Sequence, residues 1–136
     1  MSAEQQNRPT ILVVDNQPAF ILILRQLLKK TYHVVTAVTG VDALAAVATA
    51  PPDLILLDVL MPELNGFEVC RRLKEDKTTR DIPIIFVTTC ADSEDIRHGF
   101  GLGGADYLVK PFRLGELQSR ITTHLKLTEP HHERCY

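Results

Sequence analysis

The stretch Asp53–Gly66 constrains the fold of this chain more than any other part of the sequence. It begins with Leu54–Leu57, an uninterrupted apolar run that delivers one carboxylate, Asp58, into a turn containing Pro62. A strand that is apolar on both sides is typical of the centre of a parallel sheet, because helices cover both faces of such a sheet. The run therefore predicts a central strand with Asp58 at the rim, where open α/β proteins bind their ligands.

The rest of the chain alternates between strand patterns and helix patterns. We expect further strands at Ile11–Val14, His33–Ala37, Ile82–Val87 and Ala105–Val109. A helical pattern follows each of the five strands, starting near Pro18, Gly40, Phe67, Asp92 and Arg113. Connections this short allow only crossovers, so the alternation predicts an α/β fold with a parallel five-stranded sheet and right-handed crossovers.

Length and composition favour one globular domain. We expect a loose leader over residues 1–9, the domain over residues 10–127, and a polar tail or the start of a linker over residues 128–136. A formal net charge of −2 gives no basic field for nucleic acid or an anionic membrane. No apolar stretch is long enough to span a membrane, and the polar start lacks a secretory signal, so we expect a cytoplasmic protein with reduced cysteines.

Apolar spacing predicts which side of each helix faces the sheet. The first helix would bury Phe20, Ile23, Leu24, Leu27 and Leu28, and the second would bury Val41, Leu44, Ala45 and Ala48. The helix that Asp92 would cap carries Gly99 and Gly101, each costing about 1 kcal/mol relative to alanine in a helix interior. We expect this helix to be the least stable, unless its glycines act only as ordinary helix caps.

Four of the predicted strands end in side chains that carry chemistry: Asp15 with Asn16, Asp58, Thr88 and Lys110. One such residue alone usually only caps a helix or forms a turn. All four strand ends share one rim, however, and crowded carboxylates repel each other unless a metal ion or a lysine neutralises them. Clustered oxygen ligands suit Mg²⁺, and a carboxylate can accept a phosphoryl group as an acyl phosphate. The pattern therefore predicts Asp58 as a phosphoryl acceptor.

Four segments together resemble the receiver domains of bacterial response regulators. They are Val13–Asn16, Leu56–Pro62 with Asn65 and Gly66, Phe86–Thr88, and Tyr107–Phe112, in the family's order and spacing. The resemblance covers about Thr10 to Leu127. It implies the CheY-like, flavodoxin-like architecture, a three-layer doubly wound fold with strand order 2-1-3-4-5.

The resemblance also assigns roles to individual residues. It implies that Asp58 accepts a phosphoryl group from a phosphohistidine on a sensor histidine kinase or phosphotransfer protein of a two-component system. The implied Mg²⁺ ligands are Asp15, Asn16, Asp58 and the backbone carbonyl of Leu60. Lys110, with a cis bond to Pro111, would contact the phosphoryl oxygens, Thr88 would hydrogen-bond the acyl phosphate, and Tyr107 would swing inward behind it.

By the same resemblance, phosphorylation biases a surface made of the helix after Asp92, the strand Ala105–Val109 and the last helix. That surface would bind a downstream effector protein or domain, or form a homodimer, without direct nucleic-acid or membrane contact. Such a domain assists its own phosphorylation and dephosphorylation but is not a turnover enzyme. The runs Arg71–Lys74 and Arg120–Leu127 resemble receivers joined to cyclic-nucleotide signalling domains, and both a stand-alone receiver and a fragment of a longer regulator remain open.

One position departs from the family pattern. Receivers usually carry two acids after the first strand, and here Asn16 holds the second place. An amide oxygen brings no charge, so we expect weaker Mg²⁺ binding and slower phosphotransfer than in a two-acid site. The alternative is a degenerate receiver that acts as an interaction module without phosphorylation. Leu60 argues against a haloacid-dehalogenase-type phosphatase, which needs an aspartate there, and the GxGxxG at Gly99–Gly104 follows a helix, the reverse of a dinucleotide site.

Overall fold

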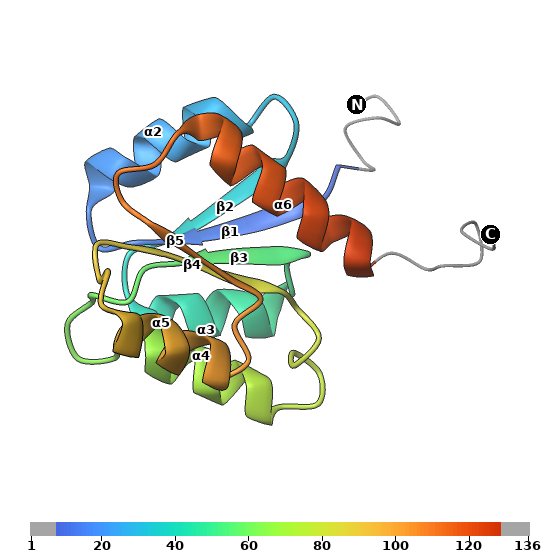
Figure 1. Cartoon of the computed structure of the whole chain (residues 1–136). Helices are drawn as coiled ribbons and strands as arrows, with labels where there is room; N and C mark the ends of the chain where they lie inside the picture. Colours follow the sequence, from blue (N-terminus) through green and yellow to red (C-terminus); the bar gives the residue numbers. More distant parts are fainter. Residues whose placement is uncertain (1–7, 129–136) are drawn as a thin grey trace, which may run out of the picture.

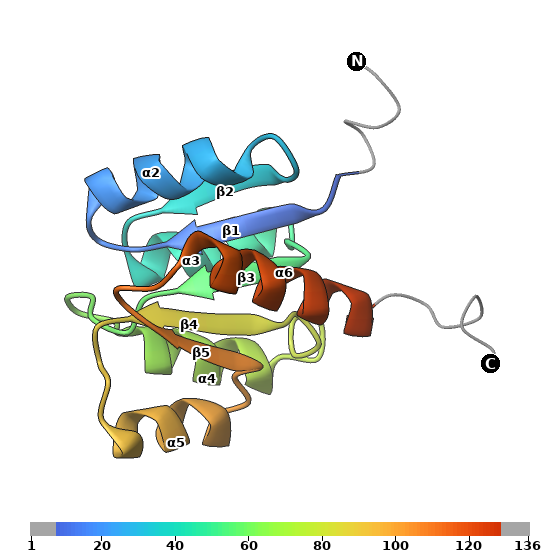
Figure 2. The same cartoon turned by 45° about the horizontal axis from the view of Figure 1, so that its top comes forward.

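The computed structural model describes residues 8–128, which contain five strands and five helices. The strands are β1 (Thr10–Val14), β2 (His33–Ala37), β3 (Leu54–Leu57), β4 (Ile84–Thr88) and β5 (Asp106–Val109). The helices are α2 (Pro18–Leu28), α3 (Gly40–Thr49), α4 (Gly66–Glu75), α5 (Ser93–Gly101) and α6 (Leu114–Thr128). All strand pairs are parallel, and the order across the sheet is β2-β1-β3-β4-β5 (Figure 2), as predicted.

Helices cover both faces of this sheet, which gives the three layers that were expected. In Figure 1, α2 and α6 lie above the strands and α3, α4 and α5 lie below them. Successive side chains of a strand point to opposite faces. In β1, Ile11 and Val13 therefore join the core beneath α2 and α6, while Leu12 and Val14 join the core over α3, α4 and α5. The central strands are buried along their whole length, as the apolar runs predicted.

The strand order reverses at β1, which pairs with β2 on one side and with β3 on the other. The chain leaves β1 towards one edge and returns past it, so α2 and α3 pack on opposite faces of the sheet. Backbone pairing continues one residue beyond the strands: Asp15 N–H donates to the Ala37 carbonyl at 3.2 Å, and Asp58 N–H donates to the Val14 carbonyl at 2.9 Å. These bonds hold both aspartates at the crevice where the order reverses.

The predicted buried faces of the first two helices were only partly right: Leu24 and Leu28 are buried and Leu44 is half-buried, but other predicted members are exposed. Helix α2 buries Ile21, Leu24 and Leu28, while Ile23 and Leu27 are 56% and 41% exposed. Because α2 is apolar on nearly all sides, its spacing allowed two faces, and packing on the sheet selects one of them. In α3 the buried residues are Gly40, Ala43 and Val47, whose small size allows close approach, and Val41 is exposed.

Two other details concern α5 and the ends of the chain. Asp92 occupies the N-cap position of α5, but its side chain makes no capping hydrogen bond.

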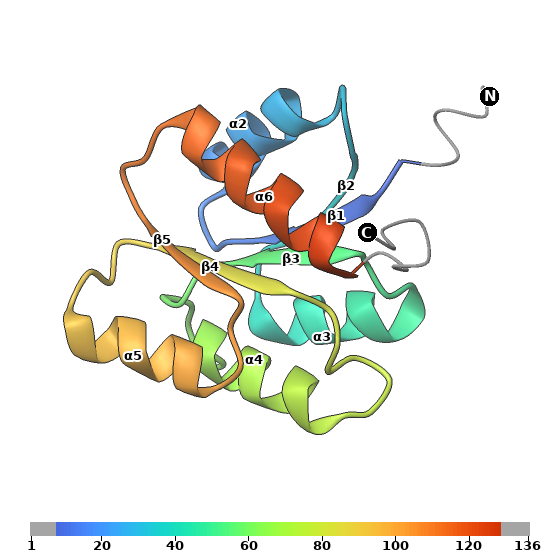
Figure 3. The same ribbon diagram turned by 45° about the vertical axis from the view of Figure 1, so that its right-hand side comes forward.

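The first strand begins and α6 ends at the same end of the sheet, opposite the end at which the strands finish (Figure 3). Most of the predicted leader and tail, residues 1–7 and 129–136, lies outside the described residues. Among the helices of residues 8–128, none is long and apolar enough to cross a membrane.

Candidate functional site

Asp58 lies at the carboxyl end of β3 and is only 5% exposed. Its pKa is raised above the ordinary value, first because burial penalises the charged carboxylate and then because Asp15 adds a second negative charge nearby. A hydrogen bond with the Thr88 side chain, the positive charge of Lys110 and the backbone N–H of Leu60 oppose this rise. Additional positive charge near Asp58 would therefore stabilise its ionised form.

Asp15 and Lys110 form an ion pair beside Asp58. The Lys110 ammonium donates to Asp15 Oδ2 at 2.7 Å, and Gln17 N–H donates to Asp15 Oδ1 at 2.9 Å. Asp15 is 1% exposed, so both of its oxygens are satisfied inside the protein. Lys110 is placed by β5, since its own N–H donates to the Thr88 carbonyl at 2.8 Å, and its peptide bond to Pro111 is cis, as expected.

A second contact of Lys110 could not be found from the sequence. Its ammonium lies 3.9 Å from the centre of the Phe20 ring, a cation–π arrangement. Phe20 was assigned to the buried face of the first helix, but it is half-buried and turns towards the site. The ring of Phe112, just beyond Pro111, stands nearly perpendicular to that of Phe20 with the centroids 6.3 Å apart. The only sequence signal was the spacing of Phe20 four residues after Asn16, which specifies no partner.

Thr88 and Tyr107 are linked through the backbone of Cys90. Cys90 N–H donates to Thr88 Oγ1 at 3.2 Å, and the Tyr107 hydroxyl donates to the Cys90 carbonyl at 2.7 Å. Burial raises the pKa of Tyr107 to about 12, so the hydroxyl stays protonated and remains a donor at neutral pH. Tyr107 is thus turned inward and connected by hydrogen bonds, through Cys90 and Thr88, to Asp58.

Gly99 and Gly66 each permit a close approach near the site. A Cβ atom on Gly99 would lie 3.1 Å from both the Phe86 and the Tyr107 rings, so the bare backbone of α5 forms one wall of the Tyr107 pocket. At Gly66 a Cβ atom would lie 2.1 Å from the Asp58 carbonyl oxygen. Gly66 N–H donates to the Val59 carbonyl at 2.9 Å, and Asn65 caps α4 by accepting from Glu68 N–H at 3.0 Å. These contacts fix the turn that follows Asp58.

The oxygen-rich rim fits the donor set of Mg²⁺, although the set is small. Asp15 and Asp58 supply two carboxylates that raise each other's free energy when both are charged, and a cation would relieve this repulsion. The predicted ligands Asn16 and Leu60 also lie at this rim, but both side chains are exposed. Residues 8–128 contain no cluster of three or more histidine, cysteine or acidic side chains that could hold a metal.

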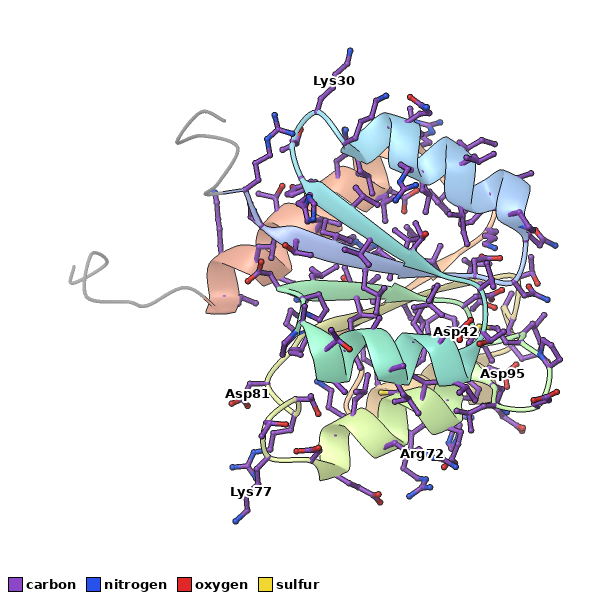
Figure 4. All side chains as sticks on the ribbon, turned by 180° about the vertical axis from the view of Figure 1, so that it is seen from behind. Lys30, Asp42, Arg72, Lys77, Asp81 and Asp95 are labelled. Atoms are coloured by element: carbon purple, nitrogen blue, oxygen red, sulfur yellow. The ribbon has the colours of Figure 1, made fainter. Side chains whose placement is uncertain are left out.

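Two further acidic side chains lie on the same side of the molecule as the rim. Figure 4 places Asp42 at the start of α3 and Asp95 at the start of α5, both on the side of the molecule where the strands end. Lys77 and Asp81 lie at the opposite end, in the connection between α4 and β4. Four of the predicted site residues, Asp15, Asp58, Thr88 and Lys110, converge at this rim.

Comparison with known proteins identifies the family. The model of the response regulator receiver domain matches residues 11–122. This chain belongs to that family. One similar solved structure is that of a BeF3-activated DrrB receiver domain, with a TM-score of 0.80 and 31% sequence identity. The match covers 88% of this chain and 98% of that one.

The curated relatives that this receiver matches are longer proteins. A probable cyclic di-GMP phosphodiesterase of Vibrio cholerae is 42% identical over 126 residues, which is 93% of this chain and 29% of that protein. The DNA-binding dual master transcriptional regulator RpaA of Synechocystis is 38% identical over 122 residues, 89% of this chain and 51% of that protein. The chain thus spans between about a third and about half of the length of these two relatives.

Proposed function

We propose that this receiver domain is a phosphorylatable switch in which Asp58 accepts a phosphoryl group from a phosphohistidine. The observation that carries the proposal is the convergence of Asp15, Lys110 and Thr88 on the nearly buried Asp58. An oxygen of Asp58 would attack the phosphorus in line, the new P–O bond would form as the P–N bond to the donor imidazole breaks, and the imidazole would keep the electron pair. The raised pKa makes the ionised carboxylate a stronger nucleophile, at the cost of a smaller ionised fraction.

The remaining residues would neutralise charge during the transfer. Mg²⁺ would be held by Asp15, Asn16, Asp58 and the Leu60 carbonyl, and it supplies positive charge to the transferring group when bound. Lys110 would leave Asp15 for the phosphoryl oxygens, to which its ammonium can donate hydrogen bonds. The Thr88 hydroxyl, which is hydrogen-bonded to Asp58, would donate a hydrogen bond to another phosphoryl oxygen. No outside substrate turns over in this scheme, so the domain would assist only its own phosphorylation and dephosphorylation.

The Thr88, Cys90 and Tyr107 chain would report the phosphoryl group to the surface. When Thr88 turns to the new acceptor, its bond from Cys90 N–H changes, and the Tyr107 hydroxyl is bonded to the same residue. The responding surface would be α5, β5 and α6. Phe100 is 47% exposed on α5, which suits this surface for an effector protein, an effector domain or a second copy of the chain. Light scattering with and without BeF₃⁻ tests the homodimer.

The phosphohistidine donor would approach over α2. Ile23 and Leu27 are exposed on this helix, next to the groove that contains Phe112 and Lys110. An apolar patch beside a reactive carboxylate suits a sensor histidine kinase or phosphotransfer protein, which must bring its imidazole close to Asp58. We place this exchange in the cytoplasm, where Cys70 and Cys90, which form no disulfide, would stay reduced.

Intact-mass measurement after incubation with acetyl phosphate and Mg²⁺ tests the proposal. We expect one phosphoryl group on the wild type and none on Asp58→Asn. Asp53→Asn is the matched control, because Asp53 lies before β3 at the far end of the sheet, where its carboxylate accepts from Thr10 N–H at 2.7 Å. An adduct that persists in Asp58→Asn would refute the assignment.

Asn16 favours one second candidate, a receiver that binds its partner without phosphorylation. With an amide in place of an acid, the rim has fewer charged ligands, and Lys110 already neutralises Asp15. The same measurement separates the two functions, because the degenerate receiver would take up no phosphoryl group from any donor. The output, including the cyclic-nucleotide signalling suggested by the sequence, would be decided by the full open reading frame.

A further inference from the structure

The ammonium of Lys110 is held from two sides. Asp15 Oδ2 accepts its hydrogen bond at 2.7 Å, and the ring of Phe20 lies on another side with its centre 3.9 Å from Nζ. Only 14% of the Lys110 side chain is exposed, so little water remains to hydrate the charge. A lysine carries four rotatable carbon–carbon bonds, and in water its ammonium would sample many positions. The two contacts limit the positions that the ammonium can sample.

Phe20 is itself held in place. It belongs to the third position of α2, a helix fixed to the sheet by Ile21 and Leu24. Its ring meets Phe112 at an interplanar angle of 89°, and Phe112 follows Lys110 by two residues. The aromatic pair therefore connects α2 with the segment after β5. An edge-to-face pair of this kind has a preferred geometry, so it orients the ring as well as burying it.

Without the Phe20 ring, the Lys110 side chain could occupy a neighbouring groove. A groove of about 510 Å³ lies against it, lined by Phe20, Ile23, Leu27, Phe112 and Lys110 itself, among others. A leucine at position 20 would keep the apolar character of this groove but would offer no negative ring face to the ammonium. The Lys110 stem could then lie along the groove with its charge turned to solvent, as long lysine side chains commonly do.

We propose that Phe20 is a positioning residue that holds the Lys110 ammonium at the carboxylate site through a cation–π contact. This role rests on the proposed phosphoryl transfer, since it matters to the reaction only if Lys110 acts on the phosphoryl group. The contact leaves Lys110 mobile enough to pass from Asp15 to a phosphoryl oxygen, because a ring face constrains the distance of the ammonium but not a single hydrogen-bond direction. Phe20 touches no reacting atom and acts through Lys110 alone.

The side-chain resonances of Lys110 give the first test, in the absence of any phosphoryl donor. Protons beside the ammonium lie over an aromatic face and carry its ring-current shift, so Phe20→Leu is expected to move them towards the values of a solvated lysine. Phe20→Tyr is expected to keep them. Leu22→Ala is the control on the exposed side of α2 and is expected to change nothing. Unchanged Lys110 resonances in Phe20→Leu would overturn the proposal.

A double-mutant cycle in urea tests whether the two side chains are coupled. We expect Phe20→Leu and Lys110→Met to show a coupling of about two- to fivefold in the unfolding equilibrium constant, the size of a partly exposed cation–π contact. Phe20→pentafluorophenylalanine sharpens the test, because it nearly keeps the shape of the ring while reversing the charge of its face. Additive effects in the cycle, or a fluorinated ring as good as phenylalanine, would mean that Phe20 contributes packing only.

The rate of phosphorylation by acetyl phosphate completes the test. We expect it to fall about two- to fivefold in Phe20→Leu and in the fluorinated variant, and to be retained in Phe20→Tyr. A rate that stays at the wild-type value while the Lys110 resonances move would refute the positioning role. If the wild type itself takes up no phosphoryl group, the proposed function fails, whereas the resonances and the cycle still decide whether Phe20 holds Lys110.

Discussion

Lys110 pairs with Asp15, not with the phosphoryl acceptor proposed at Asp58, across a sequence separation of 95 residues. The pair neutralises one of two crowded carboxylates while leaving Asp58 with a raised pKa. Lys110 therefore links two of the strand ends that form the site. Two chain segments from opposite ends of the domain, after β1 and after β5, depend on this contact.

Removing the lysine should consequently destabilise the fold. In EDTA at neutral pH, we expect Lys110→Met to lower the free energy of unfolding by about 3 kcal/mol, because it leaves Asp15 buried without a counter-ion. Adding Asp15→Asn should recover part of this loss. Urea unfolding of the two single variants and the double variant measures both, and strictly additive losses would contradict the pairing.

Asp58 should make the fold less stable at neutral pH than at acid pH. Its folded pKa is raised, so folding favours the protonated form: the contribution is fully favourable below the unfolded value of 3.8 and is lost as pH rises through the folded pKa. Asp58→Asn is therefore expected to raise the free energy of unfolding at pH 7 without Mg²⁺, because it removes the buried negative charge. Thermal unfolding across pH should show this advantage fading below pH 3.8. An advantage independent of pH would point to a cause other than the charge.

Restoring an acid at position 16 should strengthen metal binding. We expect Asn16→Asp to bind Mg²⁺ about tenfold more tightly, since it adds a negative charge to the exposed rim. The same change should destabilise the metal-free protein, because a third carboxylate joins Asp15 and Asp58. Calorimetric titration with Mg²⁺ compares the two proteins, and equal affinities would refute a ligand role for position 16.

Gly66 should tolerate no side chain. A Cβ atom 2.1 Å from the Asp58 carbonyl oxygen would push the turn away from the sheet, so Gly66→Ala is expected to lower stability by at least about 2 kcal/mol. Gly115→Ala is the matched control, because a Cβ atom there meets nothing within 4 Å in the first turn of α6. It should gain about 0.5 kcal/mol. A gain in Gly66→Ala similar to that in Gly115→Ala would show that only helix propensity is being measured and would contradict the steric role of Gly66.

The sequence predicted the strand-end residues because topology alone brings them together. Once Leu54–Leu57 and its neighbours are parallel strands, Asp15, Asp58, Thr88 and Lys110 must share one rim. The sequence could not predict which carboxylate pairs with Lys110, because the flexible lysine side chain also contacts the Phe20 ring, which lies far away in the chain.

The helix faces were predicted only in part, for a related reason. In α2 nearly every side chain is apolar, so periodicity could not separate the buried Ile21 from the exposed Ile23, and only packing against the sheet decides. Gly99 was attributed to weak helix propensity or capping, whereas its contacts with the Phe86 and Tyr107 rings are made across space by residues distant in the chain. The stability of α5 relative to the other helices stays a prediction.

Because Gly99 has no side chain, the position of the Tyr107 ring and the position of α5 depend directly on each other. Because α5 touches Tyr107 with its main chain, there is no flexible group between them to absorb a displacement. An outward rotation of the ring would leave space beside the main chain of α5, and an inward movement of the helix would meet the ring. A partner protein bound to α5 would therefore respond to the orientation of Tyr107 without contacting that residue.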